Sequence, residues 1–305
     1  MQRFIVTRLI YGVFVVFLAV TAVFFMLRLT GDPVLLFAPM DTSAKDLDEI
    51  RERMGFNDPL WVQYGRYMRD ALRGDFGEST RLHRPATAVV VERLPATLEL
   101  GVAALGISLA VGIPLGMLAA VRHGSVWDRL AGLLAVIGQA VPNFWLGILL
   151  ILLFAVALKW LPTSGRGSWE QLIMPAVALA AASVARYARL TRSAMLDVLR
   201  QDYIRTAHAK GLSPTRVIWG HAFKNASISL ITTTALEIGR LLGGAVVIEQ
   251  MFAWPGVGRV TVQALLNRDF AVVEASVVLF AVVYTVANLL ADICYAWVNP
   301  QVRVS

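Results

Sequence analysis

Two oppositely charged side chains stand inside an otherwise apolar stretch of this 305-residue chain. Glu237 and Arg240 lie three positions apart within residues 226–248, so on a helix they share one face and can neutralise each other. A charge at the centre of a bilayer costs about 2.5–3.5 kcal/mol on insertion scales, so a charged pair inside a span indicates a structural or functional role. Two interpretations are open. The pair joins neighbouring helices, or it lines a path where a zwitterionic solute would meet both signs of charge.

The short motifs of several enzyme classes are absent from the sequence. There is no Gly-x-x-x-x-Gly-Lys-Ser/Thr loop, so the chain cannot hold ATP by that device. There is also no His-Glu-x-x-His pair and no Gly-x-Ser-x-Gly elbow. The histidines are scattered along the chain: His83, His123, His208 and His221. We therefore predict no catalytic residue, no metal site and no cofactor in this chain.

A polar, basic segment, residues 202–214, lies between two apolar stretches. A helical stretch through Tyr203 and Ile204 is expected to end at Gly211, because glycine is favoured just past a helix C-terminus. Ser213 suits an N-cap and Pro214 a first helical turn, so the segment predicts a sharp corner between two short helices. It would serve either as an amphipathic helix on the membrane surface or as a handle for a cytosolic partner.

The elements that must position these residues are membrane spans. The chain is 57% hydrophobic and only 16% charged, against about 25% charged in soluble domains. Its apolar runs are long enough for six spanning helices of about 17–25 residues. They cover residues 9–27, 100–121, 130–158, 171–185, 226–248 and 275–291. We expect an all-α polytopic membrane protein, with kinks at Pro114 and Pro142 and with Arg186 reaching toward the headgroups beyond the fourth span.

The charge distribution predicts the orientation of these spans. Lysine and arginine concentrate in the segments on the same side as the N-terminus, above all residues 186–224, and are sparse in the short loops of the other side. The positive-inside rule therefore places both termini in the cytosol. The net charge of +7 reflects this topology, so nucleic acid is not an expected partner. We expect one transmembrane domain over 1–305, an external cap over 29–97 and a cytosolic loop over 190–225.

The cytosolic segment resembles a known element. Arg205-Thr206-Ala207, followed by Gly211, is similar to the "EAA" loop of ABC-importer permeases, which fits a cleft in a cytosolic ATPase. Arg205 replaces the usual Glu, and the Leu-Pro that often follows the loop is absent from residues 227–230. The arginine variant is similar to the peptide/nickel/opine branch of these permeases. Further motifs of that branch occur in order at residues 31–33, 58–64, 74–79, 93–100, 243–249 and 252–258.

The resemblance implies the type I ABC-importer permease fold and, from the long external cap, the first of two permeases. It implies import of short peptides or related small solutes such as glutathione or opines by alternating access. Nickel-chelate transport within the family, or less favourably a proton-coupled secondary transporter, remains the alternative. The residues that would couple to the ATPase are Asp202, Arg205, Thr206, Ala207, Lys210, Gly211 and Leu212.

The resemblance also implies a bacterial cytoplasmic (inner) membrane as the location, and it implies partners. They are a second homologous permease in a heterodimer, two cytosolic subunits that bind ATP and Mg, and an extracytoplasmic substrate-binding protein. The aromatic, turn-rich loop after the fifth span would meet the binding protein through Phe252, Trp254 and Pro255, although aromatic residues at this level are also typical of an interfacial belt.

Overall fold

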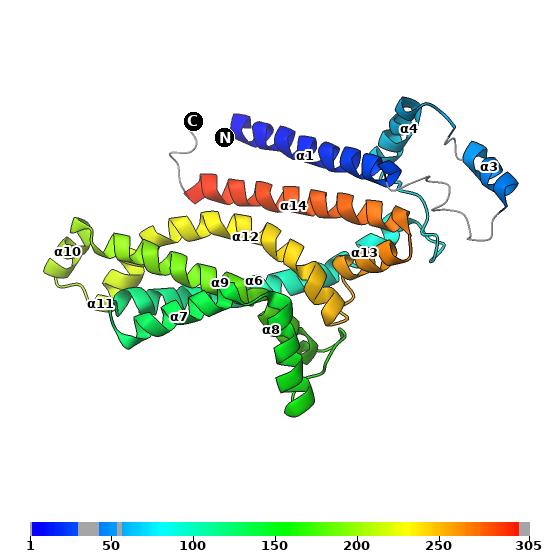
Figure 1. The fold of residues 1–305 in the computed structure, drawn as a ribbon. Helices are drawn as coiled ribbons and strands as arrows, with labels where there is room; N and C mark the ends of the chain where they lie inside the picture. The colour runs from blue at the N-terminus through cyan, green and yellow to red at the C-terminus, as the bar shows by residue number, and fades with distance from the viewer. Residues whose placement is uncertain (1, 30–42, 54–56, 299–305) are drawn as a thin grey trace. The chain divides into compact units, whose positions relative to one another are not determined.

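A computed structural model of the chain describes residues 2–29, 43–53 and 57–298 (Figure 1). Within these residues the regular elements are helices, apart from one isolated β-bridge between Glu78 and Pro85. The helices are α1 (Gln2–Leu29), α3 (Ala44–Arg53), α4 (Leu60–Leu72), α5 (Ala86–Val91), α6 (Leu94–Val121), α7 (Val126–Ala140), α8 (Asn143–Leu150), α9 (Trp169–Leu199), α10 (Asp202–Ala209), α11 (Pro214–Arg216), α12 (Lys224–Met251), α13 (Val257–Leu266) and α14 (Phe270–Val298). Two π-helical segments continue them, η1 (Ile151–Ala157) after α8 and η2 (Val217–Phe223) after α11. The expected all-α fold is confirmed.

The chain divides into two compact units. The first comprises Met1–Ile5, Leu98–Trp254 and Ala287–Ser305, and the second comprises Val6–Thr97 and Pro255–Val286. Parts of the expected external cap, residues 30–42 and 54–56, lie outside the described residues. The expectation of a single transmembrane domain with a cap and a cytosolic loop therefore stays a prediction.

Four described helices are long and apolar enough to cross a membrane unbroken. They contain the segments Val6–Met26, Ala86–Val121, Trp169–Leu199 and Phe270–Leu290. Two further pairs of helices pass the same test only together, Val126–Ala140 with Asn143–Ala157 and Pro214–Thr234 with Leu236–Met251. The expected six spans are reached if each bent pair crosses as one span.

The break at Pro142 is far sharper than the kink expected there. The helices on its two sides meet at 102°. Val141 has an extended backbone, with φ −83° and ψ 121°, as the residue before a proline favours because the proline ring clashes with a helical neighbour. α7 has 15 residues, which gives about 22 Å of helix, so it is too short to cross a bilayer core of about 30 Å alone.

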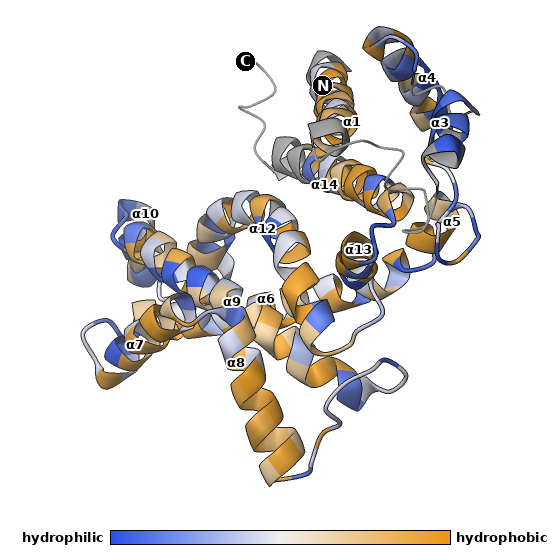
Figure 2. Cartoon of the chain, turned by 45° about the vertical axis from the view of Figure 1, so that its right-hand side comes forward, coloured by the Kyte–Doolittle hydropathy of each residue, from blue (hydrophilic) through white to orange (hydrophobic). Residues whose placement is uncertain are grey.

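Helix α9 is central to the first unit, where it packs against α7, α8 and α12. α6 approaches α9 closely at two glycines. A Cβ on Gly112 would lie 2.7 Å from the Val184 carbonyl oxygen, and one on Gly116 would lie 2.6 Å from Cβ of Thr191. Small residues permit such close packing of membrane helices. Figure 2 shows α8 as apolar along its length, whereas polar residues gather on α10.

The second unit has a core of its own between α5, α13 and the start of α14. Thr97, at the start of α6, accepts a hydrogen bond from the backbone N–H of Val257 at 2.8 Å and so holds the N-terminus of α13. Ser79 donates to Asp269 just before α14. Thr21 of α1 is hydrogen-bonded to Tyr64 of α4 at 2.8 Å, so α4 of the expected cap packs on α1.

Candidate functional site

The polar segment after α9 forms a separate short helix. The helical stretch expected through Tyr203 and Ile204 is this helix, α10 (Asp202–Ala209). α9 ends at Leu199, and Gln201 takes an extended backbone, with φ −75° and ψ 149°, before α10 begins at Asp202. The break turns the chain so that one side of α10 can pack back on the bundle.

The corner after α10 has the expected local chemistry. Gly211 has φ +75°, the left-handed conformation that glycine adopts without strain. The Gly211 N–H donates to the His208 carbonyl at 2.9 Å and the Leu212 N–H donates to the Ala207 carbonyl at 3.3 Å, which together make a Schellman motif. Pro214 is the first residue of α11, as expected. Ser213 precedes it with an extended backbone, but its side chain makes no capping hydrogen bond.

The inner side of α10 sits on a hydrophobic cluster. Ile204 and Ala207 are buried there against Met117 of α6, Met195 of α9 and Val217 of η2. Leu212 of the corner packs against the same cluster. This short helix therefore contacts α6, α9 and η2, the segment that leads into α12.

The outer side of α10 is exposed. Arg205 is 79% exposed and its described partner is Asp202, at 3.5 Å across one helical turn. Thr206, Lys210 and Gly211 are exposed as well. Of the seven residues expected to contact an ATPase, five thus lie on an open surface. Ala207 is buried within the chain and Leu212 half-buried, so these two hold α10 in place and do not offer a contact surface.

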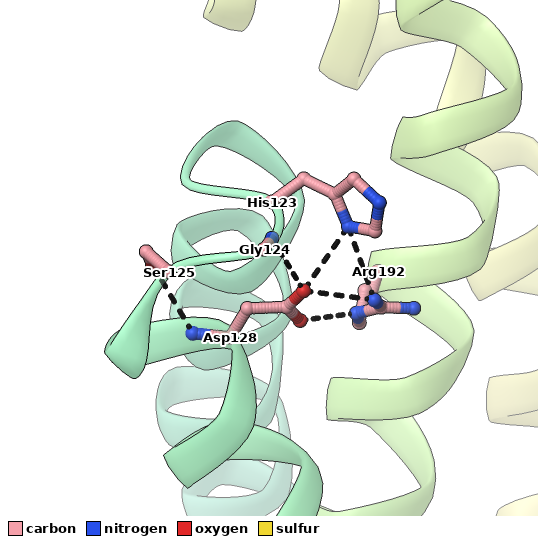
Figure 3. A network of polar contacts seen from close by, with 5 residues as sticks. All are labelled: His123, Gly124, Ser125, Asp128 and Arg192. Carbon is pink, nitrogen blue, oxygen red and sulfur yellow. Dashed lines mark hydrogen bonds and ion pairs between the residues drawn. The ribbon is translucent and has the colours of Figure 1, made fainter.

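An ion pair between a buried carboxylate and a half-buried guanidinium fastens α7 to α9 (Figure 3). The Asp128 carboxylate is held by Arg192 through two hydrogen bonds, at 2.5 Å and 3.0 Å, and accepts a third from the Gly124 N–H at 3.0 Å. His123 lies 3.0 Å from the same carboxylate. Sequence reasoning missed this network, because its two charges stand 64 positions apart. The signal available was a lone acid, Asp128, in a basic turn.

The charged pair of the fifth span belongs to a larger polar cluster between α9 and α12. Glu237 is 1% exposed; it accepts a hydrogen bond from the Ser183 hydroxyl at 2.6 Å and contacts Arg240 at 3.5 Å. Arg186 lies 3.4 Å from the same carboxylate, instead of reaching to the headgroups as expected. Because Glu237 is enclosed, the pair does not present both signs of charge. Only the Arg240 side chain, 56% exposed, projects from the α12 surface.

The loop after α12 places its aromatic residues inward. Phe252 and Trp254 are buried, and the loop before α9 covers them. The Gly165 N–H donates to the Phe252 carbonyl at 3.0 Å, and the Arg166 guanidinium lies 5.9 Å from the centre of the Trp254 ring. In this structure Phe252 and Trp254 cannot touch another protein directly. Pro255 is half-buried and lines a pocket with Arg93, Arg259 and Gln263.

Among the described residues, no group of three or more histidine, cysteine, aspartate or glutamate side chains is arranged to hold a metal ion. The features that stand out are instead a solvent-facing helix seated on the ends of long apolar helices and a charged cluster between two of them. These features indicate a helical membrane protein with an exposed polar loop.

Comparison with protein families agrees with this class. The model of the binding-protein-dependent transport system inner membrane component matches residues 112–304, and the model of the N-terminal part of such membrane components matches residues 1–101. The chain belongs to this family of inner membrane transport components.

Curated relatives align over nearly the whole chain. The glutathione transport system permease protein GsiC of Escherichia coli (strain K12) is 39% identical over 304 residues, 99% of each chain. GsiC of Salmonella paratyphi A is 41% identical over 285 residues, 93% of each chain. Among solved structures, the inward-facing MetNI methionine ABC transporter matches with a TM-score of 0.60 at 18% identity, covering 69% of this chain and 96% of that chain. The expected ABC-importer permease fold and membership of the peptide-type permeases are confirmed.

Proposed function

We propose that the chain is the transmembrane permease subunit of an ATP-driven importer of short peptides or peptide-like solutes such as glutathione. The GsiC relatives, alike over 99% of the chain, support this cargo class. The observation that carries the mechanism is the seating of α10: its inner side is buried against α6, α9 and η2, while its outer side is open. Such a helix can pass the motion of a cytosolic ATPase into the spans.

The proposal includes the partners that the chain needs. Two cytosolic subunits would bind ATP and Mg and contact the exposed residues of α10. A second, different but homologous permease would complete the path, and an extracytoplasmic binding protein would deliver solute. Both termini would lie in the cytosol, as the distribution of lysine and arginine favours. The binding protein would contact the outer loop at Pro255 and its pocket, because Phe252 and Trp254 are buried.

The test is reconstitution of the complete transporter in proteoliposomes, with uptake of radiolabelled glutathione and of a labelled tripeptide as readouts. Uptake that requires ATP and the binding protein supports the proposal. Uptake that persists when the ATPase subunits are inactivated, but collapses with the proton gradient, would replace it by secondary transport.

Coupling through α10 is tested by Arg205→Ala. This side chain is 79% exposed and supports no buried contact, so the fold should remain intact. We expect loss of co-purification with the ATPase, or a several-fold drop in ATPase activity stimulated by the binding protein. The matched control is Arg122→Ala, at an exposed arginine in the turn between α6 and α7. Equal effects of the two variants would show that general surface charge, and not α10, governs the association.

A further inference from the structure

One side of α12 is open at membrane depth and carries both polar and apolar residues. The exposed positions recur at helical spacing: Ser229, Thr232, Leu236, Arg240, Gly243 and Val247. Arg240 follows the 43° bend between Thr234 and Leu236 and lies 11 residues before the end of α12 at Met251, about 17 Å along the helix, so it stands well inside the membrane. An exposed arginine at that depth faces a water-filled cavity or a protein partner, because contact with lipid is too costly.

The cluster around Arg240 carries an excess of positive charge. Arg186 and Arg240 both contact one carboxylate, that of Glu237, at 3.4 Å and 3.5 Å. One negative charge against two positive charges leaves one positive charge over. A guanidinium has five N–H donors, and the described contacts engage few of them. Arg240, at 56% exposure, can direct its remaining donors away from the helix pair.

Because the carboxylate is buried, only the positive charge of this cluster is accessible to a solute. Glu237 is 1% exposed and is already bonded to Ser183 at 2.6 Å, so it is not accessible to an incoming ammonium group. Its role is to hold the two guanidinium groups side by side. Guanidinium groups recognise carboxylates with charge-assisted and often bidentate hydrogen bonds.

We propose that Arg240, held in place by Arg186 and Glu237, is a specificity-determining binding site for a solute carboxylate on the translocation path. The inference rests on the proposed import function and narrows its cargo to solutes with a free carboxylate, such as peptides with an unmodified C-terminus. It replaces the expectation of a site for both ends of a zwitterion, since only the positive side of the cluster is accessible.

The experiment is direct binding of radiolabelled glutathione to the purified permease–ATPase complex without its binding protein. This arrangement removes the selectivity of the binding protein from the measurement. The competitors are unlabelled glutathione and glutathione diethyl ester, which lacks both free carboxylates. We expect unlabelled glutathione to compete and the diester to compete at least about tenfold less well, because the ester loses the charge-assisted hydrogen bonds.

The variants are Arg240→Met, Arg240→Lys and, as a control outside the spans, Arg122→Met. Loss of the guanidinium should weaken glutathione binding by about 10- to 100-fold, the effect of losing a hydrogen bond between charged groups. Lysine should restore part of the affinity, since it keeps the charge without the planar fork. Arg122→Met should bind as the wild type does.

Three outcomes would overturn the inference. They are absence of glutathione binding to the wild-type complex, equal competition by the diester, or unchanged affinity in Arg240→Met. Failure of Arg240→Met to assemble with the second permease would instead assign Arg240 to the interface between permeases, and would also overturn it. Uptake driven by ATP in the wild-type proteoliposomes would still stand in each case, so the proposed function is judged separately.

Discussion

Truncation of Ile204 should loosen α10 from the hydrophobic cluster on which it packs. Ile204 is 2% exposed and packs in the cluster with Met117, Met195 and Val217. Ile204→Ala removes three carbon atoms, worth about 0.8 kcal/mol each in transfer, or about 2.4 kcal/mol before any cavity term. Measured losses for such core truncations run from about 2 to 5 kcal/mol. Since α10 has only 8 residues, it cannot hold together without this packing.

The assay is amide hydrogen exchange of the peptide that contains residues 202–209, with the transporter in lipid nanodiscs. If α10 opens locally, a loss of about 2–3 kcal/mol should speed its exchange by about 30- to 150-fold. Exchange in the middle of α9 should remain as in the wild type. The binding-protein-stimulated ATPase activity should fall in parallel, because a loosely held helix transmits little force.

The matched control is Arg205→Ala, one position further along. Arg205 is exposed and contributes no buried contact, so exchange in α10 should remain unchanged. Unaltered exchange in Ile204→Ala would refute the idea that the hydrophobic cluster seats α10. Faster exchange with full coupling would refute the idea that the seat transmits the motion.

Two further predictions concern the contacts that hold α9. Gly116→Leu should lower the thermal midpoint of the purified protein by several degrees, because a Cβ at this position would lie 2.6 Å from Cβ of Thr191. The control Gly106→Leu should leave the midpoint unchanged, since a Cβ there meets nothing within 4 Å. Arg192→Gln should lower the free energy of unfolding by about 1–3 kcal/mol, because it leaves the buried Asp128 carboxylate without its charged partner. Arg192→Lys should recover only part of this loss. A thermal midpoint equal to that of Arg122→Gln would show that the ion pair is not stabilising.

Local features of this protein were predictable from neighbouring residues. The apolar runs indicated spanning helices because a bilayer requires about 20 apolar residues in succession. The corner at Gly211 and Pro214 followed from backbone conformations that each residue type prefers by itself. The break at Pro142 was also indicated, although its angle of 102° depends on the packing of the helices on both sides.

Contacts between distant positions were not predictable in this way. The family resemblance named Ala207 as a residue that would contact an ATPase, but the sequence could not say that it would be buried with Met117 and Met195. In the same way, the pairing of Glu237 with Arg240 could be predicted because the two residues are three positions apart on one helix. The second partner of Glu237, Arg186, lies on another helix and could not be predicted.

The sequence by itself therefore determined the class of protein, the apolar segments and the place of the α10 corner, since these depend on composition, hydropathy and local backbone preference. The tertiary structure alone decided which of the candidate residues are exposed. It buried Ala207, Phe252 and Trp254, and it enclosed Glu237 while leaving Arg240 open. The physical reason is that burial depends on which helices pack together, and a periodic pattern within one helix does not identify its neighbour.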